Sequence, residues 1–441
     1  MRQMKMRRAT DRQTPIRIVA GMQYGSEAKG MVAAALCREF NIDYAVRTGA
    51  VNAGHTVYYS GKAYKMQQLP TGWVNPDTRL VIGPGALVNE TILDHERVMI
   101  AEATGEVRVP MIDPRAAMHD WGHTERSMKS GRHHSMGATG KGCSEALIDR
   151  IKNRGTGKDT ILGPTRANKY GMAADVERLL NEAYDDGASI LLEGTQGQGL
   201  DLLLGPWPFT SHKPTSPAQW LVENGLSPNL KTEIVGVART HPIRVAGNSG
   251  PLAREMSWPE MTAAIGVRSL DGGLETSLWR LEPVVEFTKK AQEMAERWAV
   301  EGKLPRYTDT EKANFAFHTW HSQTRDEYRM AVSEFHSEVM RALPQATVEE
   351  LSKTWEYTTV TRKLRRVAQW DVDQIKDSIR QMRPNYIVLT FLNYWFPEVD
   401  RKTELSERAI RRVHALQKEI GVEIRYVTTG PEGHHMLSME A

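Results

Sequence analysis

The stretch of sequence that decides the fold is Gly21-Met22-Gln23-Tyr24-Gly25-Ser26-Glu27-Ala28-Lys29-Gly30. It follows a β-branched run at residues 16–20 and precedes a helix-forming segment at residues 29–40. In such a strand–loop–helix unit, glycines let backbone N–H groups surround phosphate oxygens, and the helix N-terminus adds positive potential. We expect Lys29 to be an exposed loop residue that reaches the β- and γ-phosphates of a nucleotide. Because Gly30 replaces the Ser or Thr of a standard Walker A loop, an ordinary glycine turn is the alternative interpretation.

Outward from this loop, β-branched runs alternate with helical segments, which is typical of α/β proteins with a mostly parallel central sheet flanked by helices. The expected strands are residues 16–20, 44–47, 80–82, 189–192, 234–238, 386–390 and 423–427. The expected helices are residues 29–40, 89–104, 173–186, 372–382 and 404–420. Several of these strands lack apolar–polar alternation, which indicates that helices cover both faces of the sheet.

One region departs from the α/β pattern. From about residue 258 to residue 344, Glu, Lys, Trp and Met are frequent and no strand is evident, so we expect a helical insertion or lid. The chain therefore divides into a basic tail (1–14), a nucleotide-binding α/β core (15–251), the helical insertion (252–350) and the C-terminal part of the core (351–441).

Composition excludes several classes of protein. The 441 residues include 57 basic and 54 acidic side chains, and a net charge of +3 does not indicate a nucleic-acid partner. Two cysteines are too few for a disulfide framework and favour a reducing compartment. No apolar run approaches the roughly 20 residues that span a bilayer, and no apolar segment follows the basic N-terminus as in a signal peptide. We expect a soluble, cytoplasmic protein without a membrane partner.

Three further motifs carry candidate chemistry. Asn52-Ala53-Gly54-His55-Thr56 follows the strand at 44–47, in a small-residue loop at the strand end, where α/β sheets present catalytic groups. Glu193-Gly194-Thr195-Gln196-Gly197 follows the strand at 189–192. The hydroxyls and cations of residues 357–366 could bind a carboxylate and a phosphate. A structural histidine and a solvated basic face are the alternatives for the first and last of these motifs.

Together these motifs resemble the adenylosuccinate synthetase family. The GDEGKGK-like loop of the family corresponds to residues 25–31, its NAGHT segment is unchanged at 52–56, and its EGAQG segment corresponds to 193–197. Its TTGRPRR loop corresponds to residues 360–366 and its STGP segment to residues 428–431. The resemblance extends from residue 16 to about residue 251 and resumes from about residue 357 to residue 431.

The resemblance implies a reaction in two steps. A nucleoside triphosphate phosphorylates the 6-oxygen of a purine nucleotide, and the amine of aspartate then displaces the phosphate. Lys29 would neutralise charge on the transferring group, His55 would stabilise or protonate the leaving diphosphate, and Ser26 and the Gly54 carbonyl fall on the Mg²⁺-ligand positions. The resemblance assigns to the donor nucleotide Gly25, Glu27, Ala28, Lys29, Gly30, Gly54, His55, Thr56, Arg365, Asn393, Gly430 and Pro431.

The other two substrates have their own positions. The resemblance assigns to the purine monophosphate Ser26, Asn52, Thr139, Arg154, Gln196, Thr210 and Val245. It assigns to aspartate Val360, Thr361, Lys363 and Arg365. The family's arginine from the neighbouring subunit falls at Asn153, and we choose the adjacent Arg154; the resemblance thereby also implies a homodimer with shared sites. Lys363 replaces an arginine and lacks its bidentate fork.

Ser26 is the main departure from the family pattern. Its position is that of an aspartate that removes the purine N1 proton and helps to ligate magnesium. A serine cannot act as a base without a partner, so the mechanism must differ. Serine also removes bulk and negative charge beside N1 and C2, so that a 2-amino group, and hence guanine, could fit. A subset of the family that this chain resembles, the phage 2-aminoadenylosuccinate synthetases, carries serine here and acts on dGMP.

A second departure concerns the phosphoryl donor. The family's TKLD segment, whose carboxylate binds guanine, is here Thr390-Phe391-Leu392-Asn393. Asparagine can pair with adenine, so we expect ATP or dATP. The expected reaction joins L-aspartate to dGMP and yields 2-amino-2′-deoxy-N6-succinyladenylate, ADP or dADP, and phosphate. An adenylosuccinate synthetase that acts on IMP and a catalytically silent nucleotide-binding regulatory protein remain as alternatives.

Overall fold

The computed structural model describes residues 14–156, 158–256 and 364–440, together with isolated positions between residues 258 and 356. Most of the expected basic tail and helical insertion lies outside the described residues. Val360, Thr361 and Lys363 also lie outside them.

The core of the fold is a ten-stranded sheet with the order β17-β16-β15-β11-β1-β10-β2-β5-β7-β9. All its neighbouring strands are parallel except β16 and β17, which confirms the predicted mostly parallel sheet. The strands are β1 (Ile16–Gly21), β2 (Tyr44–Arg47), β5 (Arg79–Ile82), β7 (Met111–Ile112), β9 (Met172–Ala173), β10 (Ile190–Glu193), β11 (Thr232–Arg239), β15 (Tyr386–Thr390), β16 (Ile424–Thr428) and β17 (Met436–Ser438).

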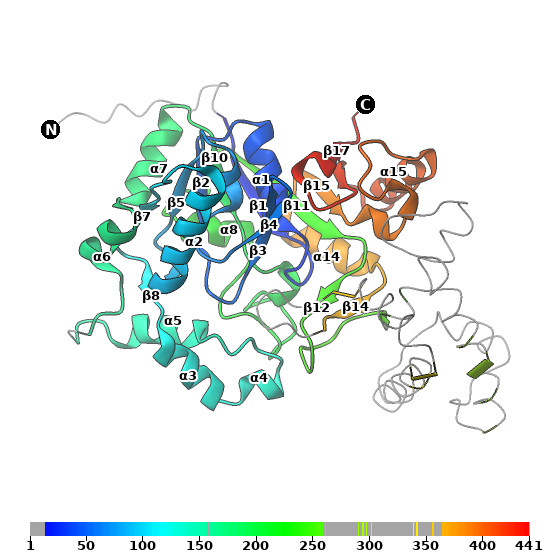
Figure 1. Ribbon diagram of the computed structural model, residues 1–441, viewed down its shortest axis with the longest axis horizontal. Helices are drawn as coiled ribbons and strands as arrows, with labels where there is room; N and C mark the ends of the chain where they lie inside the picture. The colour runs from blue at the N-terminus through cyan, green and yellow to red at the C-terminus, as the bar shows by residue number, and fades with distance from the viewer. Residues whose placement is uncertain are drawn as a thin grey trace.

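Helices cover the two faces of this sheet because its central strands are apolar on both sides. In β1, Ile18 belongs to a core cluster with Leu180 of α7 (Val176–Asp185) and Trp220 of α8 (Pro217–Val222). The next residue, Val19, belongs to a cluster with Leu36 of α1 (Lys29–Glu39). Successive side chains of a strand point to opposite faces, so this one strand contributes to two cores. In Figure 1, α15 (Glu407–Ile420) and α6 (Gly163–Tyr170) lie toward opposite ends of the molecule.

The remaining helices include α2 (Glu90–Thr104) and α14 (Val372–Met382), which pack on the apolar side chains of the sheet. They also include α3 (Trp121–Lys129), α4 (Arg132–Ser135) and α5 (Cys143–Lys152). Short strands form three small sheets from β3 (His55–Tyr59) with β4 (Lys62–Met66), β6 (Leu87–Val88) with β8 (Ala117–Met118), and β12 (Ile243–Arg244) with β14 (Arg366–Ala368) and β13 (Glu255–Met256). In the parts of the chain with described structure, no helix combines the length and apolar character needed to cross a membrane.

The expected position of His55 in a loop was wrong. His55 is the first residue of β3, which pairs with β4 in an antiparallel hairpin. Ser60 and Gly61 form the turn with φ angles of 49° and 75°, which is the left-handed conformation that tight hairpin turns require. The hairpin fixes the backbone of His55, so the imidazole does not depend on a mobile loop for its position.

Candidate active site

The phosphate loop, residues 22–28 between β1 and α1, is organised around the buried carboxylate of Glu27. Its Oε1 accepts hydrogen bonds from the backbone N–H groups of Gln23 (3.0 Å) and Gly25 (2.8 Å). Its Oε2 accepts from Lys29 Nζ at 2.7 Å. Gly25 has a φ of 95°, which favours glycine, and Ala28 adopts a φ of 64° just before α1 begins. The loop is therefore held in shape by one of its own side chains.

The environment of Lys29 differs from the exposed loop position that the sequence predicts. We expected an exposed lysine, but Lys29 is only 2% exposed and its ion pair with Glu27 is buried on both sides. The first residue of α1 lies against the sheet, and the long side chain runs back to the loop carboxylate. A buried cation in this position is pre-oriented toward the loop, and its removal would leave Glu27 as an unpaired buried charge.

His55 takes part in a buried hydrogen-bond network with the end of β10. Its Nδ1 lies 2.5 Å from Glu193 Oε1, which also accepts from Arg47 Nη1 at 2.8 Å. Glu193 Oε2 accepts from the backbone N–H of Thr71 at 2.7 Å and from its hydroxyl at 2.9 Å. Glu193 thus holds the Nδ1 side of the ring and leaves Nε2 for a ligand.

The surroundings of His55 and Glu193 shift the pKa values of both side chains. Burial and the neighbouring Arg47 cation lower the pKa of His55 to about 4, so the imidazole is neutral at pH 7 in the free protein. Burial alone would raise the pKa of Glu193, but the Arg47 charge and the hydrogen bonds of His55 and Thr71 outweigh it and lower that pKa. A polyphosphate beside His55 would favour the imidazolium form, because an anion stabilises a nearby cation.

The sequence did not assign this role to Glu193 or Arg47. The sequence predicts Glu193 only as part of the motif at 193–197, and Arg47 only as the last residue of the strand at 44–47. Both residues end neighbouring parallel strands and are register partners in the sheet. The sequence signal for this ion pair is that each of two apolar strands ends in a charged residue.

Gly30 makes the approach of the phosphate loop to His55 possible. A Cβ added at Gly30 would lie 2.6 Å from the His55 Cβ and 3.1 Å from the Thr71 Cγ2. Only glycine allows α1 and β3 to come this close. The start of α1, including Lys29, and the His55 network therefore form one site.

A cavity of about 610 Å³ lies beside this site. Its lining includes five of the seven residues expected to bind the purine monophosphate, namely Asn52, Thr139, Gln196, Thr210 and Val245. It also includes Tyr24 and Arg244, whose guanidinium lies 4.6 Å from the centre of the Tyr24 ring. Burial lowers the pKa of Arg244 to about 10, which still leaves a cation at pH 7 to face an anionic ligand. Five separate segments of the chain thus meet in one pocket.

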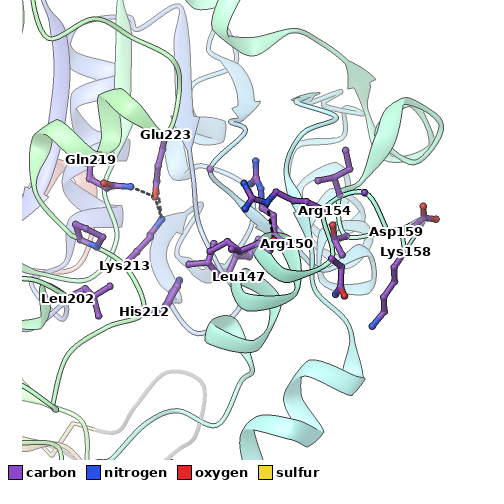
Figure 2. Close-up of a pocket in the computed structure, with 18 residues that line it drawn as sticks. Leu147, Arg150, Arg154, Lys158, Asp159, Leu202, His212, Lys213, Gln219 and Glu223 are labelled. Atoms are coloured by element: carbon purple, nitrogen blue, oxygen red, sulfur yellow. Dashed lines mark hydrogen bonds and ion pairs between the residues drawn. The ribbon is translucent and has the colours of Figure 1, made fainter.

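Ser26 and Arg154 do not line this cavity. Ser26 lies in the phosphate loop, where its carbonyl accepts a hydrogen bond from Arg239 Nη1 at 3.1 Å. Arg154 is exposed and lines a second cavity of about 760 Å³. Figure 2 shows it beside Arg150, away from the ion pair of Lys213 and Glu223. Within one chain, Arg154 is not brought to the other monophosphate residues.

Hydrogen bonds join the expected donor-base segments to each other and to the phosphate loop. The Phe391 N–H donates to Thr428 Oγ1 at 3.0 Å, and the Arg401 N–H donates to the Thr429 carbonyl at 2.8 Å. The Thr390 hydroxyl donates to the Glu27 carbonyl at 3.0 Å. The segments that begin at Thr390 and Thr428 are therefore adjacent, and the first of them contacts the loop that would bind the phosphates.

Arg365 connects the expected aspartate loop to the same region. Its Nη1 lies 3.4 Å from Glu356 Oε2, and Glu356 also pairs with Arg239 at 2.5 Å. Arg239 stacks on the Phe391 ring at 3.9 Å and donates to the Ser26 carbonyl. Arg365 thus belongs to a cluster that contacts both the phosphate loop and the expected donor-base segment.

The expected metal ligands supply only neutral oxygens. Among the residues with described positions, no three His, Cys, Asp or Glu side chains are grouped as a metal site. The Ser26 hydroxyl and the Gly54 carbonyl are hard oxygen donors of the kind that Mg²⁺ accepts when phosphates and water complete its shell. Gly54 directly precedes His55, whose Cβ approaches Gly30, so these donors fit a metal that is held mainly by the nucleotide phosphates.

Comparisons with known proteins show which family and which fold the chain resembles. Two curated relatives are the adenylosuccinate synthetases of Methanococcus maripaludis strain S2, 35% identical over 247 residues (55% of this chain and 70% of the relative), and of Thermococcus sibiricus, 34% identical over 248 residues (56% and 71%). Among solved structures, the cyanophage S-2L succinoaminodeoxyadenylate synthetase bound to dGMP and to dATP as an energy donor has a TM-score of 0.65 at 20% identity, with 98% of this chain and 97% of that chain covered. The adenylosuccinate synthetase of Plasmodium falciparum has a TM-score of 0.64 at 15% identity, with 96% and 100% covered.

The family model described as adenylosuccinate synthetase matches residues 18–170 and 165–395. These matches include the phosphate loop, the His55 network and most of the cavity described above. The chain therefore belongs to the adenylosuccinate synthetase family of carbon–nitrogen ligases.

Proposed function

We propose that the protein joins L-aspartate to dGMP with ATP or dATP as phosphoryl donor, and releases 2-amino-2′-deoxy-N6-succinyladenylate, ADP or dADP, and phosphate. The observation that carries the proposal is Ser26 in a site that otherwise retains its machinery. Lys29 and Glu27 hold the phosphate loop, and Glu193 holds His55. A catalytically silent protein would be expected to lose these groups. Loss of only the carboxylate at position 26 instead favours a different purine substrate.

The substrate assignment follows from the chemistry of position 2 of the purine. Guanine carries an amino group there and hypoxanthine carries hydrogen. A serine side chain is smaller than an aspartate and uncharged, so it leaves space for that amino group. The cyanophage S-2L enzyme, which shares the fold, is described as bound to dGMP and to dATP as an energy donor, and this supports the same pair of substrates here.

The residues of the chain then have distinct tasks. Lys29 neutralises charge as the bond from the γ-phosphorus to the β–γ bridging oxygen breaks, a bond to the purine 6-oxygen forms and the N1 proton of the purine passes to water. His55, held by Glu193, presents Nε2 to the leaving diphosphate. The amine of aspartate then attacks C6, and phosphate leaves with the former 6-oxygen. When bound, Mg²⁺ supplies further charge neutralisation on the phosphates, with Ser26 and Gly54 as its protein oxygen donors.

Binding tasks are assigned to the remaining groups. We assign the monophosphate to the cavity lined by Asn52, Thr139, Gln196, Thr210 and Val245, and we assign Ser26, in the phosphate loop that also supplies Tyr24 to this cavity, to the purine base. We assign the donor to Gly25, Glu27, Ala28, Gly30, Thr56, Asn393, Gly430 and Pro431, where Glu27 acts by shaping the loop. Val360, Thr361, Lys363 and Arg365 are assigned to aspartate. Arg154 would reach the monophosphate of a second subunit in a homodimer.

The test is turnover of dGMP, GMP and IMP, each with aspartate and ATP, followed by phosphate release and by mass spectrometry of the succinylated product. We expect kcat/KM for dGMP to exceed that for IMP at least tenfold, since fitting one extra group contributes about 1–3 kcal/mol. A preference for IMP would support the alternative that the protein is an ordinary adenylosuccinate synthetase, as its curated relatives are named. Nucleotide binding without phosphate release from any mixture would support the silent regulatory protein.

A further inference from the structure

We propose that Asp400 makes the donor-base site discriminate between adenine and guanine by locking the side-chain amide of Asn393 in one orientation. The inference rests on the proposed assignment of Asn393 to the donor base. Asp400 lies outside every motif that the sequence presented. It is placed at the site by the structure alone, where Asn393 Nδ2 donates to Asp400 Oδ1 at 3.0 Å.

The two residues are buried and held by the backbone. Each is 6% exposed. Asn393 lies in the short helix η3 (Leu392–Tyr394), and Asp400 follows a second one, η4 (Pro397–Val399). The segment between them begins at Phe391, which is bonded to Thr428, and turns at Arg401, which has a φ of 52°.

Both ends of this segment are tied to the late motif at 428–431. The Arg401 N–H donates to the Thr429 carbonyl at 2.8 Å, and the Thr429 hydroxyl donates to the Lys402 carbonyl at 2.6 Å. These bonds hold the two residues that directly follow Asp400. Its carboxylate therefore has a fixed position relative to Asn393 and to the residues expected beside the donor base.

A carboxylate selects one end of an amide because it only accepts hydrogen bonds. The NH₂ group of Asn393 must face Asp400, since turning the amide over would bring two oxygens together. Asn393 then offers its Oδ1 and its second N–H in a fixed order. An amide without such a neighbour could turn over and offer the reverse order.

This order matters because adenine and guanine have opposite hydrogen-bond donors and acceptors at N1 and at position 6. Adenine has a donor at position 6 and an acceptor at N1, whereas guanine has an acceptor at position 6 and a donor at N1. An amide that turns over can pair with either base. An amide locked by Asp400 pairs with one base and opposes lone pairs or hydrogens of the other. For the proposed ATP or dATP donor, the locked order is the one that suits adenine.

The same geometry limits how the preference can be reversed. Asn393→Asp alone places two carboxylates about as close as the present 3.0 Å bond, and one of them would have to take up a proton. Exchanging the two groups as Asn393→Asp with Asp400→Asn keeps one carboxylate and one amide. The carboxylate then faces the base, where it can accept from the N1–H and the 2-amino group of guanine.

The experiment is equilibrium binding of ADP and GDP, by calorimetry without acceptor substrates, to the full chain. Wild type should bind ADP at least tenfold more tightly, as a bidentate pair contributes about 1–3 kcal/mol of discrimination. Asp400→Asn should reduce this ratio at least fivefold, mainly through tighter GDP binding. Glu398→Gln is the matched control, because Glu398 is a carboxylate of the same segment that accepts from Ser406 instead. It should leave the ratio unchanged.

The exchanged pair keeps the proposal testable should Asp400→Asn fail to fold. It should prefer GDP, whereas Asn393→Asp alone should bind both nucleotides weakly. An ADP-to-GDP ratio that is unchanged in Asp400→Asn, or a full switch to GDP by Asn393→Asp alone, would overturn the role of Asp400 and leave the donor assignment intact. A wild type that prefers GDP would overturn the donor assignment and this inference together, without bearing on dGMP as the acceptor.

Discussion

Ser26 lies in the phosphate loop at the position where the family pattern has an aspartate, and in the proposed site its hydroxyl takes the place of that carboxylate beside the purine. Ser26→Asp would return bulk and charge to that place. We expect the ratio of kcat/KM for dGMP to that for IMP to fall at least tenfold, because the 2-amino group loses its space and the carboxylate can take the N1 proton of hypoxanthine.

Ser26→Ala is the control for the Ser26→Asp variant. Alanine keeps the space but removes the hydroxyl, so the dGMP-to-IMP ratio should stay within about threefold of wild type even if kcat falls. An unchanged ratio in Ser26→Asp would show that residue 26 does not touch the edge that distinguishes the two purines. The assignment of dGMP would then have to rest on the remaining site.

His55 provides a second residue-scale prediction, which concerns its protonation. With its pKa lowered to about 4 by burial and by Arg47, His55 stays neutral when the unfolded chain takes up a proton near pH 6.5. The free energy of unfolding should therefore fall as the pH is lowered from about 6.5 toward 4, by an amount on the order of 3 kcal/mol. His55→Asn should remove most of this pH dependence in urea unfolding. It should also lower kcat roughly 10²-fold.

NMR titration of the His55 ring tests the electrostatic cause directly. The ring should titrate near pH 4 in the free protein, and its pKa should rise when a nonhydrolysable donor analogue binds, because the phosphates favour the cation. A pKa near 6.5 in the free protein would contradict the burial of the ring. A pKa that does not respond to the analogue would remove His55 from contact with the phosphates.

The sequence predicted most residues of the candidate site but few of their partners. The family resemblance assigned Asn52, Gln196 and Val245 to one site, and the structure brings them together in one cavity. It could not show that Glu27 closes the phosphate loop or that Glu193 holds His55, because those contacts depend on side-chain direction across separate strands. Asp400 carried no motif, and its relation to Asn393 arises from the path of the chain between two short helices.

Among the elements, the contact between α1 and β3 depends on the missing side chain of Gly30. In Gly30→Ala the new Cβ would lie 2.6 Å from the His55 Cβ, so the hairpin or the helix must shift. We expect a loss of about 1–3 kcal/mol in the free energy of unfolding and a loss of at least tenfold in kcat. Gly122→Ala in α3 is the control, since its Cβ would meet nothing closer than Asp120 Oδ1 at 3.2 Å. Equal stability and activity in the two variants would mean that the contact tolerates rearrangement.

Some helices and strands were predicted with their observed bounds, whereas others were missed. The strands at 44–47 and 386–390 and the helix at 372–382 were predicted with their observed bounds, because buried apolar runs and an acidic cap define them. The hairpin of β3 and β4 was missed, although Ser60-Gly61 between two β-branched or aromatic runs was a turn signal. The small helices α3, α5 and α6 were also missed, since each has ten residues or fewer and is polar on average.

At the scale of the whole molecule, the proposed site is incomplete within one chain. Arg154 lines the second cavity and not the one that gathers the other monophosphate residues, yet the resemblance expects an arginine there from a neighbouring subunit. If two copies share their sites, Lys29 of one copy and Arg154 of the other serve the same reaction. Arg154→Ala and Lys29→Ala should each abolish most activity, for different reasons and in different chains.

Mixing these two inactive variants should then restore activity. In a hybrid dimer, one site combines an intact Lys29 with an intact Arg154 from the partner, and the other site has lost both. Random exchange makes half of the dimers hybrid, so the mixture should reach about a quarter of wild-type activity. Mixing Arg154→Ala with Arg154→Ala/Lys29→Ala is the control, since no subunit combination in that mixture offers an intact Arg154. Absence of recovery after unfolding and refolding the mixed variants together, with dimers present by light scattering, would place Arg154 outside the site and leave the monophosphate to the residues of a single chain.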